Sequence, residues 1–364
     1  MKAIVIGGGL GGLAAAVALR KVGWDVDVLE RAPEFGEVGA GIGMMPNALR
    51  ALDELGLGAE VRRLGTPRVA GGIRAADGRW LAKLPAVGQE EIVAIHRADL
   101  HRTLLEALPA KCLHNNVKAT LQDGVDADLV VAADGIRSGI RAQLFPHFPE
   151  PVYAGATAWR GVAPGPFEDL EIAQTLGPGG ECGVLPLGDG RVCWYVSTVA
   201  PPNADLDPFE LFEKWHDPIP RLMAATENIL RHDIFELAAP LPTYVRGKVA
   251  LLGDAAHAMT PYLGQGACMA LEDAVVLASC VADDELPSAL ARYDQARRPR
   301  TQRIARAARQ IGRFGLELRN PVAVGMRDFV FRALPSNIAL RGMTRFSAWQ
   351  APRLHPIGSN PSVT

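Results

Sequence analysis

The chain has 364 residues, of which 48% are hydrophobic and 21% charged, and its formal net charge is −2. That length allows about two domains, and the composition is typical of a globular protein outside the membrane. No apolar run approaches the roughly 18 to 20 residues that a membrane-spanning helix needs. The glycine-interrupted N-terminus lacks the cleavage site of a secretory signal, so the cytoplasm is the default expectation.

Charge and cysteine content exclude further classes of site. Residues 290–364 hold 14 arginines and three acids, which makes this segment +11 and the remainder −13. Because these arginines follow a helical spacing, we expect a solvated helix face docked on an acidic body, and not a nucleic-acid site. The five cysteines show no metal-ligand spacing, and their odd number favours packed, reduced thiols. We predict no metal.

The first elements in the chain form a βαβ unit. Residues 2–6 are a strand-like apolar run, residues 10–22 have helical composition, and residues 25–29 alternate like a second strand. Two later apolar runs, 127–135 and 248–255, each end in aspartate beside glycine. Because ligands bind at the carboxyl ends of parallel strands, we expect these runs to be strands of the same sheet.

Residues 153–239 contain three further strand-like segments separated by turns, and they predict an inserted antiparallel sheet. The pattern is helical from Gly266 to about Leu318, with interruptions at Pro287 and Pro299, and again over residues 320–345. The predicted fold is α/β, with a Rossmann-like nucleotide-binding domain, an inserted β-sheet domain and C-terminal helices. The expected boundaries are 1–150 with 240–290, then 151–239, then 291–364.

A glycine motif opens the first helix. Gly7, Gly9 and Gly12 form G-x-G-x-x-G directly after the first strand, and Glu30 ends the second strand. The motif demands a tight turn at Gly7, a bare backbone at Gly9 where a pyrophosphate approaches the helix, and close packing at Gly12. Glu30 would accept hydrogen bonds from ribose hydroxyls. The alternative is a plain tight turn, and NAD or FAD would satisfy the motif equally.

Two further motifs follow in order: ADGIRSGIR from Ala133 and LLGDAAHAMTPYLGQGACMALEDA from Leu251. With GAGIGMMPNALRAL from Gly39 and HRADL from His96, they make the chain similar to single-component FAD-dependent aromatic hydroxylases. The likeness spans about residues 1–345. It lies in the branch that contains salicylate, 3-hydroxybenzoate and urate hydroxylases and zeaxanthin epoxidase.

The resemblance implies FAD as the cofactor and NADH or NADPH as a transient co-substrate. Glu30 and Arg31 would lie beside the adenosine, and Arg97 would reach the phosphates or the ribityl chain. Asp134 would lie near the pyrophosphate, and Asp254 would bind a ribityl hydroxyl. The full set of expected cofactor-binding residues is Gly7, Gly9, Leu10, Gly11, Gly12, Glu30, Arg31, Gly41, Gly43, Arg97, Val117, Asp134, Gly135, Asp254, Pro261, Gly264, Gln265, Gly266 and Ala267.

The resemblance also implies a role for the third motif. A helix that begins near residues 264–267 would direct unpaired N–H groups and a positive dipole end at the flavin pyrimidine edge. His257 is expected to pack or orient this loop, and Cys268 and Cys280 to lie in the core. The alternative is that Asp254 is a turn residue and the glycines mark a loop.

The implied reaction is a monooxygenation. Hydride from NAD(P)H reduces FAD, O2 adds at flavin C4a, and the hydroperoxide hydroxylates or epoxidises a small, aromatic substrate. The chain shows no second strand-linked G-x-G-x-x-G for a separate NAD(P)H domain. Alternatives are another FAD-dependent oxidoreductase, such as a dehydrogenase or halogenase, or a non-catalytic nucleotide-binding protein. We expect a monomer or homodimer.

Substrate contacts are expected from the inserted sheet and the flavin loop. Candidates are Tyr195, Trp159, Arg160 and Tyr262, with Tyr195 and Gln265 as catalytic candidates. Trp159 and Tyr195 could equally be core residues, and Arg160 is expected to pair with a structural acid. Where urate hydroxylases carry an arginine and a tyrosine, this chain has Glu181 and Cys193, so urate is not the expected substrate.

Overall fold

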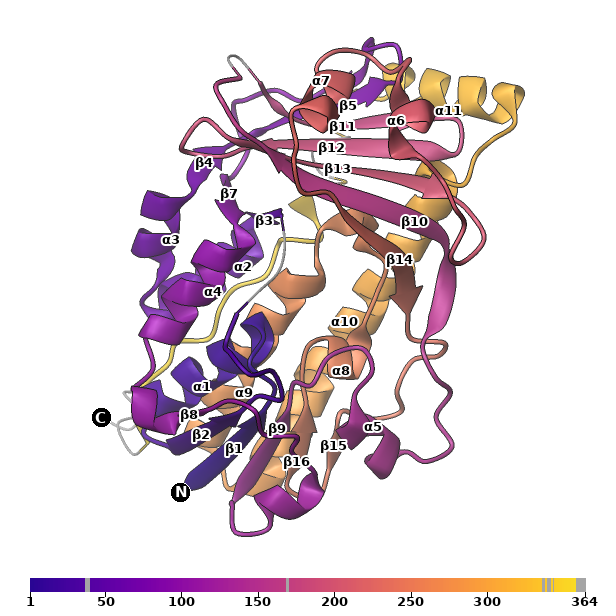
Figure 1. The fold of residues 1–364 in the computed structure, drawn as a ribbon. Coiled ribbons are helices and arrows are strands. Elements are labelled where there is room, and N and C mark those ends of the chain that lie inside the picture. The colour runs from indigo at the N-terminus through magenta and orange to yellow at the C-terminus, as the bar shows by residue number, and fades with distance from the viewer. Residues whose placement is uncertain (37–39, 168–169, 336–337, 339–341, 343, 358–364) are drawn as a thin grey trace.

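The computed structural model describes residues 1–36, 40–167, 170–335, 338, 342 and 344–357. A six-stranded, mostly parallel sheet forms one end of the molecule, and a seven-stranded, mostly antiparallel sheet forms the other (Figure 1). The helices of the first sheet are α1 (Leu10–Lys21), α9 (Gly266–Asp283) and the long α10 (Leu286–Gly315). This arrangement matches the predicted α/β fold class.

The parallel sheet joins three segments that are distant in sequence. Its strand order is β15-β16-β9-β1-β2-β8. The strands are β1 (Lys2–Ile6), β2 (Asp25–Leu29), β8 (Leu113–His114), β9 (Leu129–Ala132), β15 (Val245–Arg246) and β16 (Val249–Leu251). Strands β1, β9 and β16 are adjacent and parallel, as predicted, and their apolar side chains belong to the main core. Their carboxyl ends therefore bring the three motifs to one edge.

The seven-stranded sheet has the order β14-β10-β13-β12-β11-β5-β6. Its strands are β5 (Ala70–Ala75), β6 (Trp80–Lys83), β10 (Val152–Ala163), β11 (Ile172–Gly177), β12 (Gly180–Pro186), β13 (Val192–Val199) and β14 (Leu230–Glu236). Three of them coincide with the strands predicted for the inserted sheet. Strands β5 and β6 come from much earlier in the chain, an addition that the sequence analysis did not anticipate.

Smaller elements complete the fold. A three-stranded sheet comprises β3 (Gly41–Met44), β4 (Thr66–Arg68) and β7 (Ile92–His96). The short helices are α2 (Pro46–Leu55), α3 (Gly58–Leu64), α4 (Arg97–Glu106), α5 (Gly139–Leu144), α6 (Pro208–Phe212), α7 (Ile219–Ala224), α8 (Asp254–His257) and α11 (Pro321–Ala333), with 3-10 turns η1 (Ala110–Cys112), η2 (Leu121–Gly124) and η3 (Pro261–Leu263).

The predicted helix interruption at Pro299 is wrong, whereas the chain does break between α9 and α10, just before Pro287. Helix α10 continues through Pro299 although a proline cannot donate to the carbonyl four residues earlier. Arg297 and Arg300, on either side of it, both bind Glu272 of α9. We infer that these ion pairs hold α10 on α9 across the missing hydrogen bond. Part of the helix expected over 320–345 lies outside the described residues.

Candidate functional site

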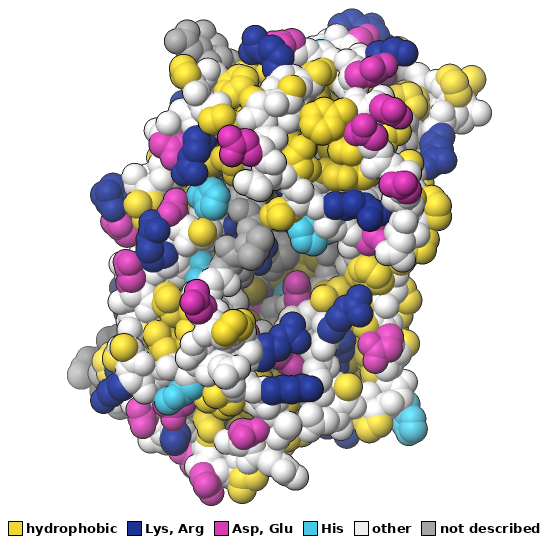
Figure 2. Space-filling view, viewed as in Figure 1, with side chains coloured by type: hydrophobic (Ala, Val, Ile, Leu, Met, Phe, Trp, Pro, Cys, Tyr) yellow, Lys and Arg dark blue, Asp and Glu magenta, His cyan; other side chains and the backbone are white. Residues whose placement is uncertain are grey.

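A cavity of about 1420 Å³ lies between the two sheets. Figure 2 shows the surface hollowed at this level. The three motif turns line one side, and the face of the seven-stranded sheet lines the other. Of the predicted site residues, all line this cavity except Gly12 and Trp159.

The first glycine motif packs the chain tightly where β1 meets α1. Gly7 has φ +112°, and a Cβ there would collide with the carbonyl of Ala133. A Cβ at Gly12 would collide with the carbonyl of Gly7, so the close packing expected at Gly12 is present. The N-terminus of α1 is thereby held at the cavity edge, where its first N–H groups are free of intrahelical partners.

Glu30 lies at the end of β2, next to this helix terminus. Its carboxylate accepts hydrogen bonds from the N–H of Gly8 at 2.6 Å and of Ala32 at 2.8 Å. A carboxylate has about four lone-pair sites, so Glu30 keeps capacity for ribose hydroxyls. Arg31 and Val117 line the cavity beside it.

The second motif places a buried acceptor at the cavity. Oδ2 of Asp134 accepts a hydrogen bond from the N–H of Ile140 at 3.1 Å, whereas Oδ1 is buried and has no partner among the described residues. Gly135 follows with φ +80°, and a Cβ there would meet nothing within 4 Å. An orphaned buried acceptor costs about 1–3 kcal/mol, so this arrangement fits a bound group that donates a hydrogen bond.

The third motif forms the facing wall. Asp254 begins α8 and is exposed to the cavity, and Gly264 has φ +61° just before α9. A Cβ at Gly266 would meet nothing within 4 Å, so packing does not require glycine there. Helix α9 starts at Gly266, within the predicted range, and presents its unpaired N–H groups and positive dipole end. These features fit an electron-rich ring.

Gln265, just before α9, is held by a buried network that the sequence analysis did not find. Its amide oxygen accepts from Nδ2 of Asn47 at 3.0 Å, and the same nitrogen donates to Glu272 at 2.7 Å. Arg297 binds both Glu272 and Asp273 at 2.6 Å. The network thus connects the start of α9 with α2 and α10.

The Arg-rich segment is therefore only partly as predicted. It docks on acidic side chains, but Arg297 is 1% exposed and is not part of a solvated face. Burial would raise the pKa of Asp273, yet His257 and Arg297 hold it at about 2. His257 contacts Asp273 at 2.6 Å, consistent with the loop-orienting role expected for it. In the sequence, the one sign of this buried network was the pair of adjacent acids, Glu272 and Asp273, within an otherwise apolar helical segment.

Strand alternation decides which predicted sheet residues reach the cavity. Arg160 and Tyr195 are cross-strand neighbours on the cavity face, and the Tyr195 ring lies over Gly183. Trp159 points to the opposite face, where it packs in a core with Trp194 beneath α6 and α7. The expectation that Trp159 contacts substrate is corrected, because adjacent strand residues face opposite ways.

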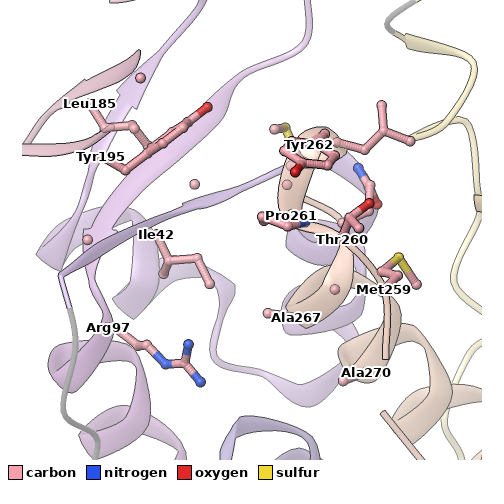
Figure 3. A pocket seen from close by; sticks show the side chains of 18 of the residues that line it. Ile42, Arg97, Leu185, Tyr195, Met259, Thr260, Pro261, Tyr262, Ala267 and Ala270 are labelled. Atoms are coloured by element: carbon pink, nitrogen blue, oxygen red, sulfur yellow. The ribbon is translucent and has the colours of Figure 1, made fainter. Parts of the chain in front are cut away.

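Two tyrosines face each other across the cavity (Figure 3). Tyr195 comes from β13 and Tyr262 from η3. Burial raises the pKa of both Tyr262 and Tyr195 above the ordinary value of a tyrosine hydroxyl. Both hydroxyls are therefore neutral hydrogen-bonding groups near neutral pH.

Within the described residues, the ion pair expected between Arg160 and a structural acid is absent. Among the described residues, no carboxylate forms an ion pair or hydrogen bond with its guanidinium. Burial and the nearby Arg97 lower its pKa. Arg160 thus offers an uncommitted cation to a ligand.

Glu181 also lines the cavity, although in the sequence it stands out only as a departure from urate hydroxylases. It is 2% exposed, and burial raises its pKa to about 7. Glu181 lies five residues before Pro186 on β12, and this spacing did not indicate which face of the sheet its side chain would occupy.

The family described as FAD binding domain matches residues 1–308. Aurachin C monooxygenase/isomerase of Stigmatella aurantiaca is 37% identical, over 92% of this chain and 94% of that protein. The 2-heptyl-3-hydroxy-4(1H)-quinolone synthase of Pseudomonas aeruginosa is 34% identical, over 92% and 95%. A variant of Klebsiella pneumoniae HpxO complexed with FAD superimposes with a TM-score of 0.84 at 26% identity, over 95% and 98%.

In the ranges that the structure covers, no helix combines the length and apolar character needed to cross a bilayer. The similarities extend over nearly the whole polypeptide, and the glycine and aspartate motifs that predicted them line one cavity. The chain belongs to the FAD binding domain family, among its FAD-dependent monooxygenases.

Proposed function

We propose that this enzyme uses NAD(P)H and O2 to oxygenate an aromatic or heteroaromatic ring held between bound FAD and the seven-stranded sheet. The observation that carries the proposal is the continuity of one cavity from the glycine turns to Tyr195. Bound FAD supplies the activation of O2, and the residues of the chain bind, orient and shield the reactants.

The nucleotide side of the cavity supports specific roles in holding FAD. Glu30 would bind the adenosine ribose, and the first N–H groups of α1 would bind the pyrophosphate. Asp254 and the unpartnered oxygen of Asp134 would accept hydrogen bonds from ribityl hydroxyls or nearby groups. The N-terminus of α9 would stabilise negative charge on the reduced ring.

The sheet side supports an aromatic substrate. Apolar side chains cover much of this wall, among them Leu185, Leu176 and Ile234, and polar groups such as Arg160, Tyr195 and Glu181 lie between them. The names of the two relatives direct the first choice of probes, since one of them makes a hydroxylated quinolone. Quinolones, hydroxypyridines, indoles and phenolic acids therefore form the substrate panel.

The test is turnover with labelled oxygen. We expect a yellow protein with a flavin spectrum that oxidises NADH or NADPH faster when a productive ring is present. One atom of ¹⁸O from ¹⁸O2 should appear in the product, with the remainder released as water. A coloured protein whose products contain no label would reject monooxygenation of the panel while leaving FAD binding intact.

A further inference from the structure

Glu181 is a buried carboxyl that the fold does not neutralise. Its only side-chain hydrogen bond within the described residues is from Nε2 of Gln174, at 2.9 Å. No lysine, arginine or histidine of the described chain contributes to its pKa. Burying a carboxyl with a single neutral partner is costly. The contacts of Glu181 within the fold therefore do not explain its presence as a contribution to the stability of the protein.

The groups beside Glu181 are also incompletely satisfied. Ser197 is its direct cross-strand partner on β13, and both side chains line the cavity. Directly opposite residues have Cβ atoms about 4.5–5.5 Å apart. Ser197 is 1% exposed, yet its hydroxyl has no hydrogen-bond partner among the described residues. A second buried polar group thus lacks a partner at the same place, which points to a ligand.

We propose that Glu181 accepts a hydrogen bond, and then the proton, from a ring N–H or O–H of the substrate, and thereby selects rings that carry such a donor. This inference rests on the proposed function, because it assigns the substrate-binding group of that cavity. Ser197 would supply a further hydrogen bond to the same edge of the ring. Arg160, on the other side of Tyr195, could bind a carbonyl or anionic oxygen of the same molecule.

The proton transfer is balanced and needs no additional reactant. The N–H or O–H bond of the ring breaks, its electron pair stays on the ring, and the proton forms a carboxylic acid with Glu181. The resulting anion is richer in electrons and is a better target for oxygenation. No group is oxidised or reduced in this step.

The titration range of Glu181 suits a proton acceptor. Burial raises its pKa to about 7, and the hydrogen bond from Gln174 offsets part of that rise. A general base works best when its pKa lies near the operating pH. The titratable groups that interact electrostatically with Glu181 are Tyr195 and Tyr262 and, on the opposite face of the same strand, Cys182; burial raises the pKa of each. These three groups stay neutral in this range, so Glu181 is the one that changes charge.

Binding of matched probe pairs tests the selection. The probes are 4(1H)-quinolone against 1-methyl-4-quinolone, and 3-hydroxyquinoline against 3-methoxyquinoline. Binding to the FAD-loaded enzyme is followed by the change in flavin absorbance, without NAD(P)H. We expect at least one donor ring to bind about tenfold or more tightly than its methylated partner. Glu181→Leu should abolish that difference, and Glu213→Gln, at an exposed site on another surface, should preserve it.

The conservative variant Glu181→Gln separates binding from proton transfer. It keeps an acceptor, so it should retain most of the donor preference. The parent's kcat/KM should rise with pH through about 7, and in Glu181→Gln this rise should be lost and the value at pH 8 reduced by on the order of a hundredfold. A purely structural role would not change the pH profile. Retained flavin absorbance and a cooperative thermal unfolding transition establish that each variant is folded.

Three results would overturn the inference. These are a parent that binds no donor probe, a parent that binds methylated rings equally well, and a Glu181→Leu variant that keeps the preference. In any of these cases, ¹⁸O incorporation into another ring of the panel would leave the proposed monooxygenation standing. Failure of the proposed function would instead show as unlabelled product from every ring.

Discussion

Glycine turns shape the parallel-sheet side of the cavity, so that backbone N–H groups reach its edge beside a few carboxylates, whereas strand side chains form the side made by the seven-stranded sheet. On the first side, Gly7 and Gly12 remove side chains so that the N-terminus of α1 can sit at the edge. On the second side, Arg160, Tyr195 and Glu181 project from alternate strand positions. Function on the first side depends on local spacing, and on the second it depends on strand register.

The sharpest test of this contrast compares the two faces of the seven-stranded sheet. Trp159→Ala should cost about 3–5 kcal/mol in the free energy of unfolding, because it leaves a cavity in the core beneath α6 and α7. Probe binding by the folded variant should change little. Urea unfolding of the FAD-loaded protein measures the loss.

Tyr195→Phe is the matched variant on the cavity face. It keeps the ring over Gly183 and removes only the hydroxyl, so stability should change by less than about 1 kcal/mol while KM for the substrate rises. If Trp159→Ala impaired substrate binding and Tyr195→Phe did not, the assignment of the two faces would be reversed.

These sites differ in how far sequence could predict them. The G-x-G-x-x-G spacing, Glu30 and the two aspartate turns each lie within a short segment, and parallel strands must bring their carboxyl ends to one edge. Trp159 and Arg160 were both named as candidates for substrate contact, although adjacent strand residues cannot share a face. Since apolar cores cover parts of both faces of this sheet, hydrophobicity alone did not show which face lines the cavity.

Other features could not be predicted because they depend on contacts between residues that are far apart in the sequence. The arginine spacing predicted a helix, but nothing local indicated that Arg297 would be buried against Glu272 and Asp273. Likewise, β5 and β6 join the inserted sheet through a parallel pairing with β11 that crosses about a quarter of the chain. Such contacts follow from the assembled fold and not from any one segment.

A further prediction concerns the pH dependence of the free energy of unfolding on the side of the seven-stranded sheet. Glu181 has a pKa of about 7 in the folded protein and 4.5 as the ordinary value. The native state therefore holds an extra proton between these values, and the parent loses stability as pH rises through this window. Glu181→Gln lacks that proton linkage and should be more stable than the parent above pH 7, by up to about 3 kcal/mol.

Thermal and urea unfolding at pH 5 and pH 8.5 measure this difference. The advantage of Glu181→Gln should be large at pH 8.5 and nearly absent at pH 5. A variant that gained equally at both values would show that packing, and not ionisation, causes the change. No comparable effect is expected from Glu213→Gln, whose carboxylate is exposed.

The last prediction tests FAD binding on the nucleotide side of the cavity. Glu30→Ala removes the carboxylate that accepts from the N–H groups of Gly8 and Ala32, so both the turn and the proposed ribose contact are weakened. FAD affinity should fall about tenfold, or roughly 1.4 kcal/mol. Fluorescence of FAD released on dilution measures the loss, and Glu106→Ala, on the exposed side of α4, is the control. Glu30→Gln keeps an acceptor and should lose less FAD affinity.

If Glu30→Ala held FAD as tightly as the parent, the backbone groups alone would suffice to bind the adenosine half. The contrast between the two sides of the cavity would then be stronger than proposed, because no side chain would be needed at Glu30.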